Sequence, residues 1–210
     1  MKESLKGGVK VVVVPQLLPT SPELTSYMVK LADLRPGQRI MEPQAGTGVI
    51  LKKCFDMVAG VECARFVAVE INPSLVQMLE EDKRLRLHST DYNYQIFCAD
   101  FLSLSSEDLG GKFDRVVLNP PFENAVDIRH IRHAQGMLKP DGKLVALCAN
   151  GPRQQKEFRD KGEYWEVLPE GSFKSEGTMV SVALVVLYGP GSVNGEAQSA
   201  EEMEAASMLF

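Results

Sequence analysis

Apolar runs of strand length alternate with amphipathic helical segments along most of this chain, and this alternation restricts the possible folds more than any other feature. It is typical of a parallel α/β sheet, because parallel neighbours need long crossover connections that are usually helical. The predicted strands are Gln38–Met41, Phe66–Glu70, Gln95–Cys98, Phe113–Leu118, Lys143–Cys148, Trp165–Leu168 and Met179–Tyr188. The predicted helices are Pro22–Leu34, Val49–Ala59, Pro73–Lys83, Ala125–Leu138 and Arg153–Lys161.

The connection before the last predicted strand, Pro169–Thr178, contains no helical pattern. A hairpin there makes the last strand antiparallel and places it at or near the edge of the sheet. Pro140-Asp141-Gly142 predicts a turn before the fifth strand. The expected α/β fold therefore has seven strands, mostly parallel, an antiparallel last strand, and helices on both faces.

The sequence indicates one domain, residues 1–188, followed by an acidic tail, residues 189–210, that we expect to be disordered. No apolar run approaches the roughly 20 residues of a membrane span. The start of the chain lacks the layout of a secretory signal, so we expect a cytoplasmic protein without membrane partners. Four scattered cysteines and three histidines show no metal-ligand spacing, which predicts no metal. The net charge of -5 becomes about -1 without the tail, so it does not exclude a nucleic-acid partner.

The most informative segments follow predicted strands, where ligands of open α/β sheets bind. In Glu42-Pro43-Gln44-Ala45-Gly46-Thr47-Gly48, the glycines let the backbone approach a ligand closely. A dinucleotide fingerprint needs glycine where Leu51 stands, and Leu51-Lys52-Lys53 does not complete a phosphate-binding P-loop. A ligand bound without a phosphate fits better, and a tight turn without any ligand is the alternative.

Acidic residues end the next two strands. Glu70 can accept hydrogen bonds from both hydroxyls of a ribose, or it can cap the helix that follows. Asp100 can accept a hydrogen bond from an adenine amine while Phe101 packs on the ring, although an acid at a strand end is common.

Asn119-Pro120-Pro121-Phe122 ends the fourth predicted strand. Two consecutive prolines remove two backbone donors and fix φ twice, which makes the loop stiff. The stiffness directs the Asn119 side-chain oxygen and the Pro120 carbonyl outward as two acceptors, and Phe122 adds a flat apolar face. This pattern predicts a site for a planar amine, whereas a purely structural bend needs neither the asparagine nor the aromatic residue.

These motifs resemble the amino-methyltransferase branch, with Asn-Pro-Pro-Phe or Tyr, of the class I S-adenosyl-L-methionine (SAM) dependent methyltransferases. The segment from Leu18 to Glu23 is similar to the opening of adenine-N6 DNA methyltransferases. The resemblance implies the Rossmann-like class I methyltransferase fold with SAM as cofactor. The implied catalytic residues are Asn119, Pro120, Pro121 and Phe122; the implied cofactor-binding residues are Thr20, Glu42, Pro43, Ala45, Gly46, Gly48, Glu70, Ile71, Asp100, Phe101 and Asn119.

The resemblance implies methylation of an exocyclic amine, first of all adenine N6 in DNA or RNA. Related enzymes of this type usually carry a target-recognition domain, for which this chain has no room, so a partner protein for target recognition is expected. The alternatives are a protein glutamine or rRNA guanine N-methyltransferase, and a catalytically silent SAM-binding partner or anti-restriction module. Two basic groups, Arg129 to His133 and Arg153 to Lys161, either contact a phosphate backbone or form solvated helix faces.

Overall fold

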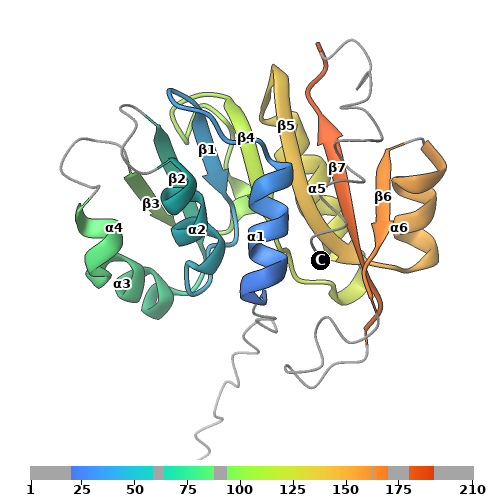
Figure 1. The fold of residues 1–210 in the computed structure, drawn as a ribbon, viewed down its shortest axis with the longest axis horizontal. Coiled ribbons are helices and arrows are strands. Elements are labelled where there is room, and N and C mark those ends of the chain that lie inside the picture. The colour runs from blue at the N-terminus through green and yellow to red at the C-terminus, as the bar shows by residue number, and fades with distance from the viewer. Residues whose placement is uncertain (1–19, 59–63, 88–93, 162, 170–179, 192–210) are drawn as a thin grey trace, which may run out of the picture.

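The computed structural model describes residues 20–58, 64–87, 94–161, 163–169 and 180–191, and these residues form one seven-stranded sheet with helices on both faces (Figure 1). Its strands run in the order β3-β2-β1-β4-β5-β7-β6, and only β7 is antiparallel to its neighbours. The bounds are β1 Arg39–Glu42, β2 Arg65–Glu70, β3 Tyr94–Cys98, β4 Phe113–Leu118, β5 Leu138–Ala149, β6 Tyr164–Val167 and β7 Val182–Tyr188. The predicted sheet is confirmed, with the antiparallel β7 one position from the edge.

The order of the strands reverses beside β1. The chain proceeds from β1 outward to β2 and β3, then returns to place β4 on the other side of β1. Met41 pairs with Val116, so β1 and β4 reach the carboxyl edge of the sheet at nearly the same level. Ligands of open α/β sheets bind at such a reversal. The loops after β1 and β4, which carry the glycine and Asn-Pro-Pro-Phe motifs, therefore leave the sheet side by side.

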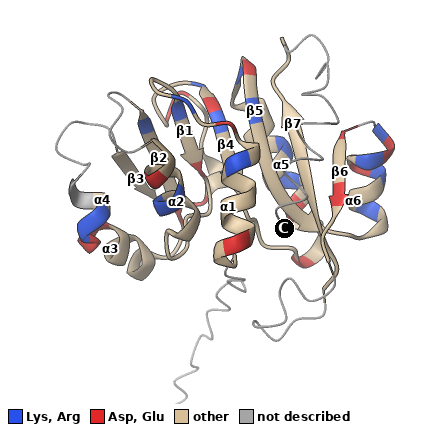
Figure 2. Cartoon of the chain, in the orientation of Figure 1, with Lys and Arg blue, Asp and Glu red and all other residues tan. Residues whose placement is uncertain are grey.

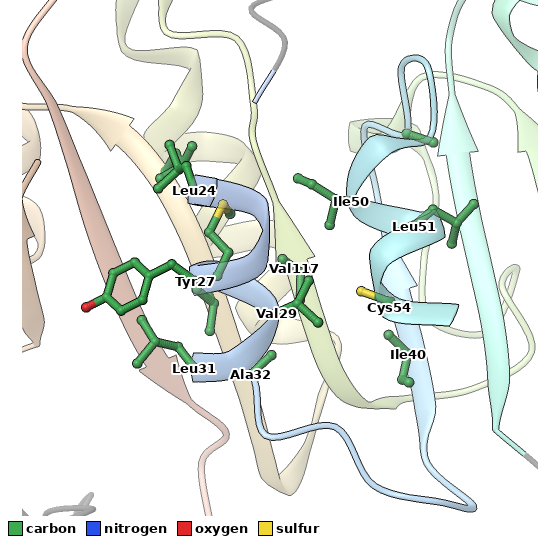
Figure 3. Packing of buried hydrophobic residues seen from close by; sticks show 14 of the residues in the cluster. Leu24, Tyr27, Val29, Leu31, Ala32, Ile40, Ile50, Leu51, Cys54 and Val117 are labelled. Atoms are coloured by element: carbon green, nitrogen blue, oxygen red, sulfur yellow. The ribbon is translucent and has the colours of Figure 1, made fainter. Parts of the chain in front are cut away.

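Two hydrophobic clusters hold the helices against the two faces of the sheet. The helices are α1 Pro22–Leu31, α2 Val49–Val58, α3 Pro73–Glu81, α4 Lys83–Leu87, α5 Val126–Gly136 and α6 Pro152–Glu157. On one face, Leu24 and Val29 of α1 and Leu51 of α2 belong to the same buried cluster as Val117 of β4 (Figure 3). On the other face, Ile131 of α5 lies in the second cluster.

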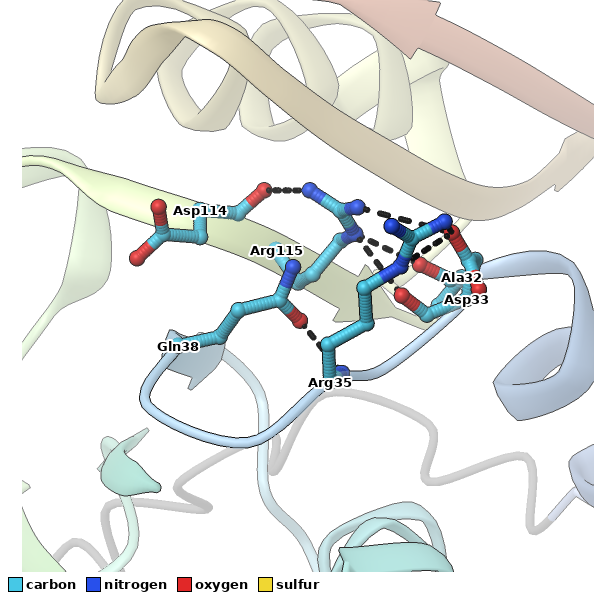
Figure 4. A network of polar contacts seen from close by, with 6 residues as sticks. All are labelled: Ala32, Asp33, Arg35, Gln38, Asp114 and Arg115. Carbon is cyan, nitrogen blue, oxygen red and sulfur yellow. Dashed lines mark hydrogen bonds and ion pairs between the residues drawn. The ribbon is translucent and has the colours of Figure 1, made fainter. Parts of the chain in front are cut away.

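The start of α1 agrees with the predicted range, and its end differs from the prediction. Ser21 Oγ accepts a hydrogen bond from Leu24 N at 3.2 Å, and Pro22 opens the helix. The helix ends at Leu31 rather than Leu34, because Asp33 adopts a φ of 49°. The guanidinium of Arg115 donates to the released carbonyl of Ala32 at 2.7 Å (Figure 4).

The polar contacts around Arg115 close the amino edge of the sheet, opposite the motif loops. Arg115 also donates to the backbone oxygen of Asp114 at 2.8 Å, and Arg35 forms an ion pair with Asp33 at 2.8 Å (Figure 4). Burial of the Arg115 guanidinium lowers its pKa, and the nearby Asp33 carboxylate opposes that shift. The side chain of Arg115 therefore connects the end of α1 to β4.

The turn predicted at Pro140–Gly142 is wrong, since these residues lie inside β5. Gly189 N donates to Gly142 O at 2.9 Å and Gly191 N donates to Pro140 O at 3.2 Å, so the segment after β7 provides ladder contacts. The pairing of β4 with β5 shifts register between Phe113 and Arg115, which absorbs the extra residues as an irregularity. The acidic tail predicted from residue 189 lies beyond residue 191 outside the described residues. No helix in the described part of the chain is long and apolar enough to span a membrane.

Candidate functional site

The loop Pro43–Gly48 between β1 and α2 is a compact turn held against β2 and α3. Ala45 N donates to Val69 O at 3.0 Å, and Gly48 N donates to Ala45 O at 2.7 Å. Gly46 and Gly48 have φ values of 52° and 74°, a region in which glycine avoids the steric cost of a Cβ. A Cβ on Gly48 would lie 2.5 Å from Leu79 Cδ2. The glycines therefore permit both the bend and its close packing against α3, and the close approach of a ligand stays a prediction.

Glu70, at the end of β2, connects this loop to the neighbouring strand. Its Oε2 accepts from Gly46 N and its Oε1 accepts from Asn72 N, both at 2.8 Å. The side chain is buried, yet each carboxylate oxygen has a second lone pair that can accept from a ligand hydroxyl. The expectation that Glu70 caps the following helix is wrong, because Asn72 is the cap and its Oδ1 accepts from Ser74 N at 2.9 Å. The contact of Glu70 with a ribose stays a prediction.

Glu42 is the most buried acid of the loop region. It is 4% exposed, and its Oε2 has no hydrogen-bond partner among the described residues. Burial raises the pKa of Glu42 well above its ordinary value, and the nearby Glu70 raises it further. A buried polar atom without a partner is uncommon in native proteins and indicates a place where a bound molecule completes the site.

The residues after β2 and β3 differ in accessibility. Ile71 is 54% exposed, which leaves a large apolar side chain beside Glu70 at the carboxyl edge. Asp100 is exposed, and its Oδ1 accepts from Leu102 N at 3.0 Å. Phe101 is 2% exposed, with its ring centroid 4.8 Å from that of His133 on α5. Most of the Phe101 ring is therefore committed to the core, and its contact with a ligand stays a prediction.

The Asn119–Phe122 loop meets the segment that precedes α1. Asn119 Nδ2 donates to Thr20 Oγ1 at 3.1 Å, which joins two predicted site residues that lie 99 positions apart. Pro120 is buried, whereas Pro121 and Phe122 are half-buried. Phe122 packs against the hydrophobic cluster that includes α1 and α2. The structure therefore brings Thr20, Asn119 and the glycine loop to the same edge of the sheet.

Two residues of the site were missed by the sequence reasoning. Gln44 Nε2 lies 2.6 Å from His130 Nδ1 on α5, so the glycine loop contacts the helix that follows the Asn-Pro-Pro-Phe loop. His130 is 9% exposed, and burial lowers its pKa to about 4. Its spacing from Ile131 and Ala134 on the buried face of α5 was a signal for its burial, but no sequence pattern identified Gln44 as its partner.

The first predicted basic group is mostly committed to internal contacts. His130 is buried, and His133 Nε2 is 2.9 Å from Leu104 O. Arg132 forms ion pairs with Glu157 at 2.8 Å and Glu163 at 3.3 Å. Of this group only Arg129 is exposed, so neither of the two expected roles, a phosphate contact or a solvated helix face, applies to all four residues.

The second group lies on α6 and the turn after it, where basic and acidic residues occur together (Figure 2). Arg159 pairs with Asp160 at 3.0 Å, and Lys161 pairs with Glu157 at 2.9 Å. Arg153 and Lys156 are exposed on α6. Among the residues that the structure describes, no group of three or more His, Cys, Asp or Glu side chains is arranged to hold a metal ion.

Comparison with protein families adds the decisive observation. The family model for N-6 DNA methylases matches residues 19–144, which is more than half of the chain and contains both motif loops. The chain belongs to this family. Its cofactor is SAM, and its fold is the Rossmann-like fold of the SAM-dependent methyltransferases.

The relatives of this chain carry names with different methylated substrates. A protein of Methanocaldococcus jannaschii provisionally named a protein N5-glutamine methyltransferase is 27% identical over 115 residues, 55% of this chain and 52% of that protein. A tRNA (guanine(10)-N2)-dimethyltransferase of Methanothermobacter thermautotrophicus is 29% identical over 102 residues, 49% of this chain and 27% of that protein. The chain thus matches about half of the first relative and a smaller part of the second.

A solved structure shares the fold over nearly the whole chain. The methyltransferase subunit of a type I restriction-modification system from Streptococcus thermophilus has a TM-score of 0.72 at 15% identity, covering 92% of this chain and 53% of that one.

The residues at the carboxyl edge fit a cofactor that joins a nucleoside to a charged amino acid. Ile71 supplies exposed apolar surface, and the carboxylates of Glu70 and Asp100 supply acceptors. The unpartnered Oε2 of Glu42 and Oε1 of Gln44 mark buried polar positions within the same loop region.

Proposed function

We propose that the chain is a SAM-dependent N-methyltransferase that acts on an exocyclic amino group, most of all adenine N6 in DNA or RNA. The observation that carries this proposal is the position of Asn119. Its side chain is held by Thr20 at the carboxyl end of β4, beside the end of β1 and its glycine loop. Family membership and the relatives that methylate amino or amide nitrogens support the same reaction type.

We further propose which residues hold the cofactor and which hold the target. The proposed cofactor residues are Thr20, Glu42, Pro43, Ala45, Gly46, Gly48, Glu70, Ile71, Asp100, Phe101 and Asn119. Bound SAM supplies an electrophilic methyl group, so the reaction needs no nucleophilic side chain. Asn119, Pro120, Pro121 and Phe122 hold the acceptor amine, which is the difficult partner because its lone pair is delocalised.

The catalytic contribution of the loop is electrostatic and geometric. The Asn119 side-chain oxygen and the Pro120 carbonyl accept the two N–H groups of the amine, which favours a pyramidal nitrogen and stabilises its growing positive charge. The stiff Pro-Pro backbone keeps both acceptors in place, so little reorganisation is needed during the reaction. Phe122 stacks on the base, and such contacts are worth about 1–3 kcal/mol. A base within a duplex must first be flipped out.

Protein glutamine and guanine amino groups are the second candidate targets. Both are planar nitrogens with two N–H groups, and the two relatives described above carry names with these substrates. We also propose that a partner protein assists target recognition. A catalytically silent SAM-binding module is the remaining alternative. The presence of the complete Asn119–Phe122 motif argues against this alternative.

The test is incubation of the chain with labelled SAM and separate DNA, RNA and protein pools. We expect label in DNA or RNA, and Asn119→Ala should lower turnover at least about a hundredfold, as for loss of a transition-state hydrogen bond, while SAM still binds. Asn150→Ala is the matched control, because Asn150 bonds to Ser181 and Gln155 instead. Near-normal turnover of Asn119→Ala would refute the assignment, label in protein alone would select glutamine, and label nowhere with SAM bound would favour the silent module.

A further inference from the structure

The contact between Gln44 and His130 joins the cofactor loop to α5 through a single pair of side chains. Gln44 lies in the loop Pro43–Gly48, and His130 lies in the second turn of α5, 86 positions later. The Gln44 Nε2 and His130 Nδ1 atoms are 2.6 Å apart, which is hydrogen-bond distance. Neither residue belongs to the set assigned to the cofactor or the target above.

Burial makes His130 a neutral partner. The ring is 9% exposed, and its burial lowers its pKa to about 4, although the Asp100 carboxylate opposes that shift. A neutral imidazole has one donor and one acceptor nitrogen, so Nδ1 can hold one end of an amide without placing a charge beside it. His130 is therefore suited to fixing the orientation of Gln44.

The other end of the Gln44 amide has no such partner. Its Oε1 is buried and makes no hydrogen bond to any described residue. If the amide is turned over, its nitrogen occupies the same position instead, and the end away from His130 again lacks a partner. Buried amide groups in native proteins are nearly always satisfied, so this position points to a bound molecule.

The same loop is held from the opposite side by Glu70. Gly46 N donates to Glu70 on β2, whereas Gln44, two residues earlier, contacts α5. Two anchors from different elements fix the bend between them.

We propose that His130 is a positioning residue for cofactor binding: it holds the Gln44 amide so that the opposite end of the amide bonds to a polar group of bound SAM. Gln44 is then a direct cofactor ligand, and His130 acts only through it. This inference rests on the proposed role of the Pro43–Gly48 loop in binding SAM.

A double-mutant cycle tests the inference with S-adenosylhomocysteine as the probe, titrated calorimetrically into the full chain. Gln44→Leu removes the ligand, and His130→Phe removes its support while keeping a buried ring. Each should raise the Kd about tenfold or more, the fold-change expected when a buried amide loses a hydrogen bond. Because His130 acts through Gln44, the Kd of the double variant for S-adenosylhomocysteine should be no higher than that of the single variant with the higher Kd.

Two further variants separate positioning from folding. His130→Asn places an amide atom near the position of Nδ1. Its Kd should therefore lie within about threefold of that of the original chain. Gln135→Leu is the matched control on the same helix, because its amide bonds to the backbone carbonyl of Tyr188 and to Arg132 rather than to the loop. It should lower the Tm without changing the Kd.

The outcomes are distinct. A Kd for His130→Phe equal to that of the original chain, or additive losses in the double variant, would overturn the inference while leaving the proposed function intact. If His130→Phe does not fold, the other two variants decide. A tenfold weaker affinity of Gln44→Leu, with the affinity of His130→Asn unchanged, supports the inference. An unchanged affinity of Gln44→Leu overturns it. Failure of the unmodified chain to bind S-adenosylhomocysteine would overturn the proposed function and this inference together.

Discussion

Asp127, in the first turn of α5, gives a quantitative test of how the helix behind the Asn119–Phe122 loop is held. Its side chain is fully buried. Oδ1 accepts from Ile128 N and Gln154 Nε2, and Oδ2 accepts from Ala149 N and Gln154 Nε2, all at 2.9 Å. One carboxylate therefore connects the start of α5 to the end of β5 and to α6.

The expected cost of Asp127→Ala follows from the groups that it strands. The N–H groups of Ile128 and Ala149 and the amide of Gln154 lose their acceptor. Each unsatisfied donor costs about 1–3 kcal/mol, so the variant should lose about 3–9 kcal/mol of unfolding free energy. A domain of ordinary stability has only about 5–15 kcal/mol in total. Asp127→Asn keeps the shape and one acceptor, and rotation of the Gln154 amide can supply a new pairing, so its loss should be about 1–2 kcal/mol.

Urea unfolding followed by tryptophan fluorescence, using Trp165, measures both losses. Asp160→Ala serves as the control, because Asp160 is an exposed acid whose pair with Arg159 should contribute less than about 1 kcal/mol. A loss below about 1 kcal/mol for Asp127→Ala would refute the argument, since it would mean that the stranded donors find other partners at little cost.

Three further predictions concern the site. Thr20→Val removes the hydroxyl that holds Asn119, so kcat should fall about tenfold or more through misplacement of the amide, and unchanged turnover would contradict the contact. His130 has its pKa lowered from 6.5 to about 4 by burial. The stability that its neutral form contributes is present above pH 6.5 and is lost as the pH falls toward 4; the Tm should therefore drop more steeply over that range than in His130→Asn. Finally, three exposed cations on α5 and α6 should contact the phosphate backbone if the substrate is a nucleic acid. Replacing them together with glutamine should reduce the slope of log K against log salt by up to about 3 in filter-binding assays, and an unchanged slope would exclude the contact. They are Arg129, Arg153 and Lys156.

The sheet could be predicted because its strands and helices differ in local periodicity. Phe113–Leu118 was predicted with the bounds that the structure has, since a buried strand between charged segments leaves little choice. The turn at Pro140–Gly142 failed for the opposite reason. Proline and glycine predict a turn locally, but hydrogen bonds from Gly189 and Gly191 convert the segment into part of β5. A partner almost 50 positions away leaves no trace in the local pattern.

In the candidate site too, the features set by neighbouring residues could be predicted from the sequence, whereas the contacts between distant residues could not. The glycine loop and the Asn-Pro-Pro-Phe loop are recognisable because the backbone conformation of each depends on glycines or prolines that lie within the loop itself. The contacts that orient them are not local: Thr20 contacts Asn119, 99 positions away in the sequence, and Gln44 contacts His130, 86 positions away. Sequence reasoning also grouped His130 with residues expected either to contact a phosphate backbone or to form a solvated helix face, because a histidine beside arginines looks exposed until the buried face of the helix is known.

The composition of α5 explains why polar contacts are needed behind the loop. Of its buried residues only Ile131 and Ala134 are apolar, while Asp127 and His130 are polar. Apolar burial is non-directional, so two such residues hold the helix against the sheet without fixing its rotation or its height. Hydrogen bonds require specific distances and angles, and those of Asp127 and His130 supply both constraints at the end nearest the Asn119–Phe122 loop. Between that loop and the helix, Asn124 and Ala125 adopt φ values of 53° and 59°, a costly conformation for residues other than glycine. The polar anchors of α5 hold the chain in this bend, so the placement of the Asn119–Phe122 loop depends on the helix that follows it as much as on its two prolines.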